Sequence, residues 1–242
     1  MKQLVVIGAG RMGTEVANLA AQSGEWELAA QVDVTTAGLL ETLGRADAAI
    51  DFSAPGSLDA VAAYVRRTGT PLVSGTTGLS TQQMETLRAL GEDAPVLYSA
   101  NYSVGVAVLR RLAAEAARML DGFDIEIVET HHNKKADAPS GTAKLLLAAV
   151  DPDGACSAVY GREGMCGVRT AREIGVHAVR GGTVAGEHTV AFFGDSEEVR
   201  LTHRADSRRI FAAGALRAAK ALAAREPGFY TFEEILFTQE EH

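Results

Sequence analysis

A glycine-rich turn close to the N-terminus restricts the fold of this chain more than any other feature. The segment Gly-Ala-Gly-Arg-Met-Gly at 8–13 follows an apolar run at 4–8 and opens a stretch whose apolar residues recur at helical spacing until Gly24. In such a strand–turn–helix unit the first glycine allows the tight turn, the second lets the backbone approach a pyrophosphate, and the third packs helix against strand. The free N–H groups of the helix N-terminus attract phosphates. The pattern predicts a dinucleotide site, with a turn that binds nothing as the alternative.

An acidic residue at the end of the second apolar run supports this prediction. Asp33 lies twenty residues beyond Gly13, the spacing at which dinucleotide folds place a carboxylate against the ribose hydroxyls. A carboxylate there repels the 2′-phosphate of NADPH, and Val34, Thr35 and Thr36 follow it where an arginine would compensate. We therefore expect NADH to be favoured over NADPH as the cofactor.

The first hundred residues predict a parallel sheet. Apolar strands are expected at 4–8, 28–32, 48–52, 71–74 and 95–98, with helices at 57–67 and 81–90 between the later ones. Strands that are apolar throughout and alternate with helices form parallel sheets covered on both faces. The loops Gly-Thr-Thr-Gly at 75–78 and Ser-Ala-Asn-Tyr-Ser-Val-Gly at 99–105 follow two of these strands. Their small polar residues suit a nicotinamide ribose, although each alone is more often a simple turn.

The pattern changes after Asn101. A helix at 104–120 leads into runs of alternating polar and apolar residues at 124–130, 173–179, 188–193 and 198–204. Such strands form a mixed or antiparallel sheet with one face exposed to water. We interpret 151–172 as a long loop and 209–224 as a final helix. The predicted fold class is therefore α/β, with a Rossmann-type dinucleotide-binding domain at 1–102 and an α+β domain with a mixed sheet at 103–208.

Composition excludes several classes of function. The chain has 242 residues, 47% of them apolar, and a formal net charge of -8. An acidic protein is a poor partner for nucleic acid, which binds basic surfaces. The apolar run at the N-terminus stops too early for a signal peptide or a membrane span, so we expect neither. The only cysteines, Cys156 and Cys166, match no zinc or redox spacing. Free thiols indicate a reducing compartment, and we expect a cytoplasmic protein.

A basic segment stands out against this acidic background. His131, His132, Lys134 and Lys135 follow a predicted strand and precede the sequence Pro-Ser-Gly-Thr at 139–142. Adjacent histidines on an extended chain point to opposite sides, and no zinc-binding spacing accompanies them, so we expect no metal. No nucleophile elbow is present either. A structural histidine remains possible, but histidine is the side chain best suited to acid–base work at neutral pH.

The residues after the histidines favour anion binding. Ser140 is a good helix N-cap, and Gly141 and Thr142 would present backbone N–H groups in the first turn. Lys134 and Lys135 add full positive charges. The segment therefore predicts a site for an anionic small molecule that gains or loses a proton, with a solvated basic loop as the alternative.

The same segment carries a specific resemblance. Glu-x-His-His-x-x-Lys-x-Asp-x-Pro-Ser-Gly-Thr-Ala at 129–143 resembles the signature of the 4-hydroxy-tetrahydrodipicolinate reductase (dihydrodipicolinate reductase) family of diaminopimelate and lysine biosynthesis. Segments at 8–13, 51–57, 75–78, 101–106, 180–190 and 207–216 resemble those of the family in the same order. The resemblance covers nearly the whole chain.

The resemblance implies roles for individual residues. His131 matches the catalytic acid–base histidine and Lys135 the proton-donating lysine. The matches to the contacts with the substrate carboxylates are His132, Gly141 and Thr142, with Ser140 and Arg208 as further candidates. The cofactor contacts implied are Gly8, Ala9, Gly10, Arg11, Met12, Gly13, Asp33, Gly75, Thr76, Thr77, Ser99, Ala100, Asn101 and Tyr102.

The resemblance also implies an assembly and a reaction. The family's second domain binds a small dicarboxylate and forms the core of a homotetramer, and its C-terminal helix returns to the dinucleotide domain, here at 209–242. The reaction is the reduction of 4-hydroxy-tetrahydrodipicolinate, through dihydrodipicolinate, to tetrahydrodipicolinate. Water leaves the substrate either on the enzyme or in solution. The alternatives are a dicarboxylate reductase similar to aspartate dehydrogenase and a non-enzymatic protein that senses NAD or binds metal.

Overall fold

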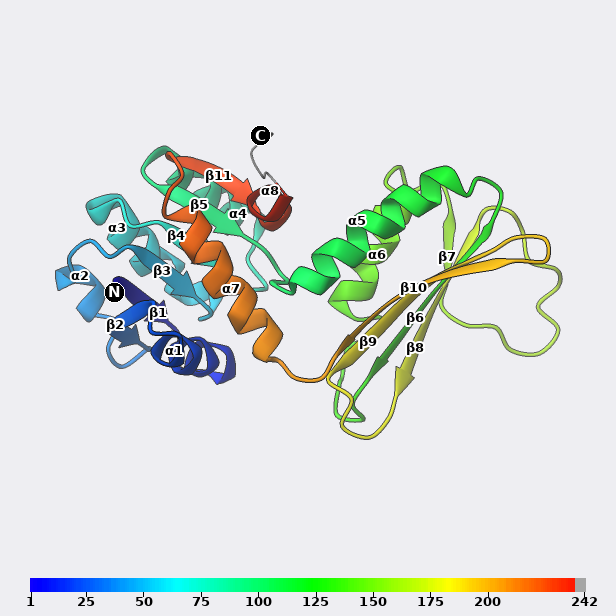
Figure 1. Ribbon diagram of the computed structural model, residues 1–242, viewed down its shortest axis with the longest axis horizontal. Helices are drawn as coiled ribbons and strands as arrows, with labels where there is room; N and C mark the ends of the chain where they lie inside the picture. The colour runs from blue at the N-terminus through cyan, green and yellow to red at the C-terminus, as the bar shows by residue number, and fades with distance from the viewer. Residues whose placement is uncertain (238–242) are drawn as a thin grey trace. The chain divides into compact units, whose positions relative to one another are not determined.

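The structure is a computed structural model that describes residues 1–237 and divides into two compact units. Unit 1 comprises Met1–Val104 and the chain from Arg209 onward, and unit 2 comprises Gly105–Arg208. Unit 1 is thus built from both ends of the chain, as the blue and red ribbons of Figure 1 show.

A six-stranded sheet forms the centre of unit 1. Its strands, in spatial order, are β11 (Gly228–Thr231), β5 (Pro95–Tyr98), β4 (Leu72–Ser74), β3 (Ala48–Asp51), β1 (Lys2–Ile7) and β2 (Trp26–Val32). All neighbouring pairs are parallel. The carboxyl ends of the strands therefore meet at one edge of the sheet, where an open α/β fold binds its ligands.

Helices cover both faces of this sheet (Figure 1). They are α1 (Arg11–Ser23), α2 (Leu39–Thr42), α3 (Leu58–Thr68), α4 (Thr81–Ala89), α7 (Arg209–Leu222) and α8 (Phe232–Phe237), with short 3-10 turns at Pro55–Ser57 and Leu90–Glu92. On one face, Val5, Leu72 and Val96 share an apolar core with Val61 of α3. On the other, α7 contacts α1 and the central strands. The predicted Rossmann-type architecture is confirmed.

A five-stranded mixed sheet forms unit 2. Its spatial order is β10 (Glu198–Ala205), β9 (Gly186–Phe193), β6 (Asp124–His131), β8 (Glu173–Arg180) and β7 (Ser157–Val159). β6 runs parallel to β8 and antiparallel to β9. The predicted α+β class with a mixed sheet is confirmed.

One face of the second sheet is covered by α5 (Val104–Met119) and α6 (Gly141–Val150), as Figure 1 shows. Leu109 of α5 and Leu146 of α6 pack with Ile127, Val176 and Phe192 of the strands. Because successive strand residues point to opposite faces, Glu129 and His131 share this covered face with Ile127. The opposite face carries Glu126, Val128 and His177.

Two segments differ from the sequence expectations. The predicted loop at 151–172 contains β7, a three-residue edge strand too short to show a period. The segment at 209–242 is not a single helix, because α7 ends at Leu222 and is followed by β11 and α8. Four residues of β11, Gly-Phe-Tyr-Thr, pair with β5 and carry no alternation that would reveal a strand. Residues 238–242 of that prediction lie outside the described residues.

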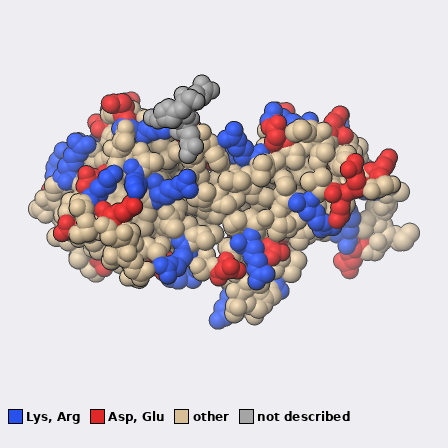
Figure 2. Space-filling model, viewed as in Figure 1, with Lys and Arg blue, Asp and Glu red and all other residues tan. Residues whose placement is uncertain are grey.

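Charges of both signs share the surface of the protein. On the face seen in Figure 2, Lys and Arg side chains are interspersed with Asp and Glu side chains, unlike the broad basic face that a nucleic-acid backbone attracts. Among residues 1–237, none of the helices combines the length and apolar character that a bilayer-spanning segment needs.

Candidate active site

The predicted cofactor residues of unit 1 lie on loops at the carboxyl ends of the strands. Backbone hydrogen bonds join these loops to neighbouring strands: Gly8 N donates to Val32 O at 2.7 Å, Gly75 N to Asp51 O at 2.8 Å, and Ser99 N to Ser74 O at 3.2 Å. The glycine turn, the 75–78 loop and the 99–102 loop therefore belong to one continuous edge of the sheet.

The three glycines of the first turn have different local surroundings. Gly8 has a φ of 110°, in the region that favours glycine, and a Cβ there would overlap the carbonyl oxygen of Phe52. A Cβ on Gly13 would overlap the carbonyl oxygen of Gly8, so this glycine brings α1 against the strand. A Cβ on Gly10 would meet nothing within 4 Å. Open space beside Gly10, immediately before the start of α1, fits the approach of a pyrophosphate.

Asp33 is held by its own loop. Its Oδ1 atom accepts hydrogen bonds from the backbone N–H and the hydroxyl of both Thr35 and Thr36, at 2.7–3.0 Å. The hydroxyl bonds from Thr35 and Thr36 lower the pKa of the Asp33 carboxyl below its usual value, so the group is a carboxylate at neutral pH. All four bonds use one oxygen of a carboxylate that lies at the end of β2.

Buried Asp51 accepts hydrogen bonds from several residues of these loops, and it was not among the predicted site residues. It is 3% exposed. Its Oδ2 accepts from the hydroxyls of Ser74 and Thr76 at 3.0 and 2.9 Å, and its Oδ1 accepts from Ser53 N at 3.0 Å. The hydroxyl of Thr76, a predicted cofactor contact, is therefore bonded to Asp51. The residue stood within the segment 51–57 that resembled the family, at the end of a predicted strand.

The 99–102 loop divides into a polar part and a buried part. The Ser99 hydroxyl donates to Asn101 O at 2.7 Å, and the Asn101 side chain accepts from Ser103 N at 2.8 Å. Tyr102 instead packs edge-on against Phe52 and Phe232, and its hydroxyl donates to Ser74 O at 2.6 Å. Burial raises the pKa of the Tyr102 phenol well above its usual value. Its side chain belongs to the core, which leaves its backbone for any contact with a cofactor.

In unit 2, His131 lies at the end of β6 beside a buried carboxylate. The Nδ1 atom of His131 is 2.6 Å from Oε2 of Glu129, which is fully buried. Arg180 of β8 donates to both oxygens of Glu129 at 2.8 Å, and Ser140 N donates to Oε1 at 3.0 Å. Burial would raise the pKa of Glu129, but the bonds from Arg180, His131 and Ser140 outweigh it and hold the pKa below its usual value.

Ser140 connects this cluster to α6. Its hydroxyl accepts from Ala143 N at 3.1 Å, so the predicted N-cap is confirmed. The same hydroxyl oxygen lies 2.9 Å from Nε2 of His188 on β9. His188 is 4% exposed, and its ring packs edge-on against that of His131 with 5.1 Å between centroids. Burial is the main cause that lowers the pKa of His188 to about 4, so the imidazole is neutral at pH 7.

The remaining predicted substrate residues surround the same loop. Lys135 Nζ lies 2.7 Å from Oδ1 of Asp137, and this bond lowers the pKa of Asp137. Arg208 Nη2 lies 3.4 Å from Nε2 of His132. Gly141 and Thr142 are the first two residues of α6. The structure thus brings cationic side chains and a helix N-terminus together at one end of the mixed sheet.

Comparison with known proteins gives one consistent family. The profile described as dihydrodipicolinate reductase, N-terminus, matches residues 2–102, and the profile for the C-terminus matches 105–236. The chain belongs to the dihydrodipicolinate reductase family.

Relatives of this family match almost the whole chain. The 4-hydroxy-tetrahydrodipicolinate reductases of Caldanaerobacter subterraneus and Akkermansia muciniphila are each 42% identical to it, and each alignment covers 98% of both chains. A dipicolinate-bound dihydrodipicolinate reductase from Paenisporosarcina has a similar fold, with a TM-score of 0.80 at 20% identity over 97% of this chain and 99% of the other.

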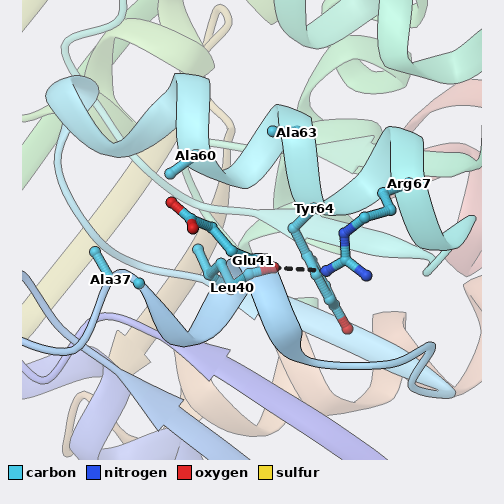
Figure 3. Close-up of a pocket in the computed structure, with 8 residues that line it drawn as sticks. Ala37, Leu40, Glu41, Ala60, Ala63, Tyr64 and Arg67 are labelled. Atoms are coloured by element: carbon cyan, nitrogen blue, oxygen red, sulfur yellow. Dashed lines mark hydrogen bonds between the residues drawn. The ribbon is translucent and has the colours of Figure 1, made fainter.

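Unit 1 also contains a cavity whose lining begins at Ala37, just after the Asp33 loop. The cavity lies between α2 and α3 and has a volume of about 390 Å³. Its lining includes Glu41, Tyr64 and Arg67 (Figure 3). The Arg67 guanidinium donates to the carbonyls of Leu40 and Leu43 at 2.7 and 2.8 Å, so it braces α2. Within residues 1–237 no group of three or more His, Cys, Asp or Glu side chains is placed to hold a metal ion.

Proposed function

We propose that this chain is an NAD(P)H-dependent 4-hydroxy-tetrahydrodipicolinate reductase that acts in diaminopimelate and lysine biosynthesis. The observation that carries the proposal is the cluster at the end of β6, where His131 and Lys135 stand beside the N-terminus of α6. It is supported by relatives with this activity at 42% identity over nearly the full length.

Unit 1 would hold the cofactor. The turn at 8–13 and the start of α1 would bind the pyrophosphate, and Asp33 the adenosine ribose. The 75–77 and 99–102 loops would bind the nicotinamide half. When bound, the reduced nicotinamide supplies a hydride. We propose that NADH is preferred, because the ionised Asp33 carboxylate would repel a 2′-phosphate and no cation follows it in the loop.

Unit 2 would hold the dicarboxylated substrate. The backbone N–H groups of Gly141 and Thr142 at the α6 N-terminus would bind one carboxylate. His132, Ser140 and Arg208 would add polar and cationic contacts, and Lys135 would place a full charge beside the dianion. This arrangement explains why an acidic protein gathers cations at one loop.

The reaction also needs a proton, because adding hydride to a conjugated imine leaves an electron pair to be protonated. Two groups are candidates for this step. Lys135 Nζ lies 2.7 Å from Oδ1 of Asp137, and His131 has its Nδ1 atom bonded to Glu129, which would leave Nε2 to exchange protons. We propose that Lys135, or His131 through a relay, delivers the proton.

We also propose that the protein assembles as a homotetramer in the cytoplasm. The face of the second sheet opposite α5 and α6 presents Val128, Thr189 and Val179, the last of these 47% exposed, which suits association between copies. Sedimentation equilibrium measures the mass directly, and a monomer at micromolar concentration would contradict this assembly.

The activity is tested by NADH oxidation with freshly prepared substrate. Oxaloacetate with ammonia serves as the comparison, because turnover there instead would indicate an aspartate dehydrogenase-like reductase. A protein that binds NADH but does not oxidise it with either substrate would be a sensor. Pyridine-2,6-dicarboxylate should compete with substrate, whereas pyridine-2-carboxylate should bind far more weakly. Equal inhibition by the two would show that only one carboxylate is recognised.

A further inference from the structure

Glu129 places a carboxylate on the face of β6 that is otherwise packed against apolar side chains. It lies on the covered face of β6, in line with Ile127, and is 0% exposed. A buried charge is expensive unless it is paired and hydrogen-bonded. Here it receives four bonds: two from Arg180, one from the Ser140 N–H and one shared with His131 Nδ1.

Arg180 is itself fixed from three sides. Besides its two bonds to Glu129, it donates to the carbonyls of Val179 and Asp137 at 2.7 and 2.8 Å. Planar guanidinium pairs of this kind hold a carboxylate in one orientation. The Glu129 oxygens therefore cannot rotate away from His131.

The bonds to Glu129 determine which ring nitrogen of His131 carries the proton. The pKa of Glu129 is low, so its side chain is an ionised carboxylate that can only accept hydrogen bonds. It already accepts from Arg180 and from Ser140 N–H. His131 must then carry its proton on Nδ1, so that Nε2 is the atom that exchanges protons. The neighbouring His188 is neutral at pH 7 and adds no charge against a protonated His131.

A glycine of the neighbouring strand lies beside Nε2 of His131. A Cβ on Gly186 of β9 would lie 3.1 Å from Nε2 of His131 and 3.4 Å from its Cδ2. These distances are tight for carbon against a ring, so a side chain here would cover the atom that exchanges protons.

We propose that Glu129 and Arg180 are positioning residues for the reductase reaction: together they hold His131 in the tautomer that carries its proton on Nδ1, while Gly186 leaves Nε2 uncovered. This inference rests on the proposed function for its kinetic consequence, but the tautomer itself is measurable without turnover.

The main test is Glu129→Gln. The side-chain amide has one acceptor oxygen, which Arg180 Nη2 and Ser140 N–H would retain, and its NH₂ group would then face His131 Nδ1 and Arg180 Nη1. We expect the proton to move to Nε2, and kcat to fall by about 10²-fold or more while KM changes little. Nitrogen-15 spectra of histidine-labelled protein, assigned with His131→Gln, report which ring nitrogen carries the proton.

A matched control exists on the other face of the same strand. Glu126 contacts His177 Nε2 at 2.7 Å and also Arg162, so Glu126→Gln makes the same chemical change beside a histidine and an arginine. We expect kcat within about threefold of wild type, because the altered group lies away from the reacting atoms. Equal losses in the two variants would mean that Glu129 only braces the sheet, and would overturn the proposal.

A second variant tests the open space. Gly186→Ala should leave the nitrogen-15 pattern of His131 unchanged and still lower kcat, because the methyl group covers Nε2. Wild-type turnover in Gly186→Ala, or an Nδ1–H signal that persists in Glu129→Gln, would each contradict the proposal. If wild-type protein reduced no dipicolinate-type substrate at all, the proposed function would fail, while the tautomer measurement would still decide the role of Glu129.

Discussion

The hydroxyl oxygen of Ser140 lies 2.9 Å from Nε2 of His188, and together they join the N-terminus of α6 to the centre of the mixed sheet. Burial lowers the pKa of His188 to about 4, whereas the unfolded value is near 6.5. The unfolded state therefore binds more protons than the native state between these two pH values. Stability that is fully present above pH 6.5 is lost as the pH falls towards 4.

His188 should thus make unit 2 sensitive to acid. Urea unfolding of wild type and His188→Asn, followed by circular dichroism from pH 7 to pH 4.5, measures the difference in unfolding free energy at each pH. As the pH falls towards 4, we expect the unfolding free energy of wild type to drop by on the order of 3 kcal/mol relative to that of His188→Asn. A difference that stays constant across this range would show that His188 accepts a proton freely in the native state.

Gly10 and Gly13 should separate cofactor binding from folding. Gly13→Ala places a methyl group on the Gly8 carbonyl, and such overpacking against backbone costs roughly 1–3 kcal/mol. Gly10→Ala meets open space, so its melting temperature should match wild type while its affinity for NADH falls. Thermal melts without cofactor and NADH fluorescence titrations measure the two effects. Unchanged affinity for NADH in Gly10→Ala would remove this glycine from the cofactor site.

Asp33 should decide between the two nicotinamide cofactors. Wild type should have the higher kcat/KM with NADH, and Asp33→Ala should shift the ratio towards NADPH by about tenfold, or 1.4 kcal/mol. Thr36→Val serves as the control, because it removes the two hydrogen bonds between the Thr36 hydroxyl and Asp33 but keeps the charge. A tenfold preference of the wild type for NADPH would sink the role given to Asp33.

Lys135 should affect both binding and turnover. Lys135→Ala removes a charge beside a dianion, so KM should rise and kcat should fall by about 10²–10⁴-fold. Lys135→Arg keeps the charge but cannot release a proton near neutral pH, and its larger fork fits Asp137 differently. It should retain more binding than Ala and recover little kcat. Turnover of Lys135→Arg at the wild-type rate would make Lys135 an electrostatic anchor and leave proton delivery to another group.

Sequence patterns predicted the helices, turns and caps that are determined by residues close together in the chain. The strand–glycine–helix unit at the N-terminus depends on neighbouring residues, and Ser140 caps α6 by accepting a hydrogen bond from Ala143 N. The two sheet types followed from apolar runs and alternation, which reflect burial on two faces or one. By contrast, β7 and β11 are edge strands of three and four residues, each paired with a single neighbouring strand.

The environment of His131 depended on pairing that no local pattern contains. Arg180 is 51 residues from Glu129 in sequence, and only the register of β6 against β8 brings the two together. His188 reaches Ser140 through the pairing of β9 with β6. One signal was available: residues 129 and 131 are two apart on a predicted strand, so their side chains had to share a face. A glutamate on that face, two residues from a histidine, indicates a hydrogen-bonded Glu–His pair.

A ribosome that synthesises this chain finishes unit 2 before it finishes unit 1. When Arg208 has been added, the first five strands of the parallel sheet exist, but α7 and β11, which cover its face and its edge, do not. At typical rates, the hundred or so residues of unit 2 take roughly 5–20 seconds to make. Unit 1 therefore waits with apolar surface exposed. Released chains that end at Arg208 should show protease-resistant unit 2 and protease-sensitive residues 1–104.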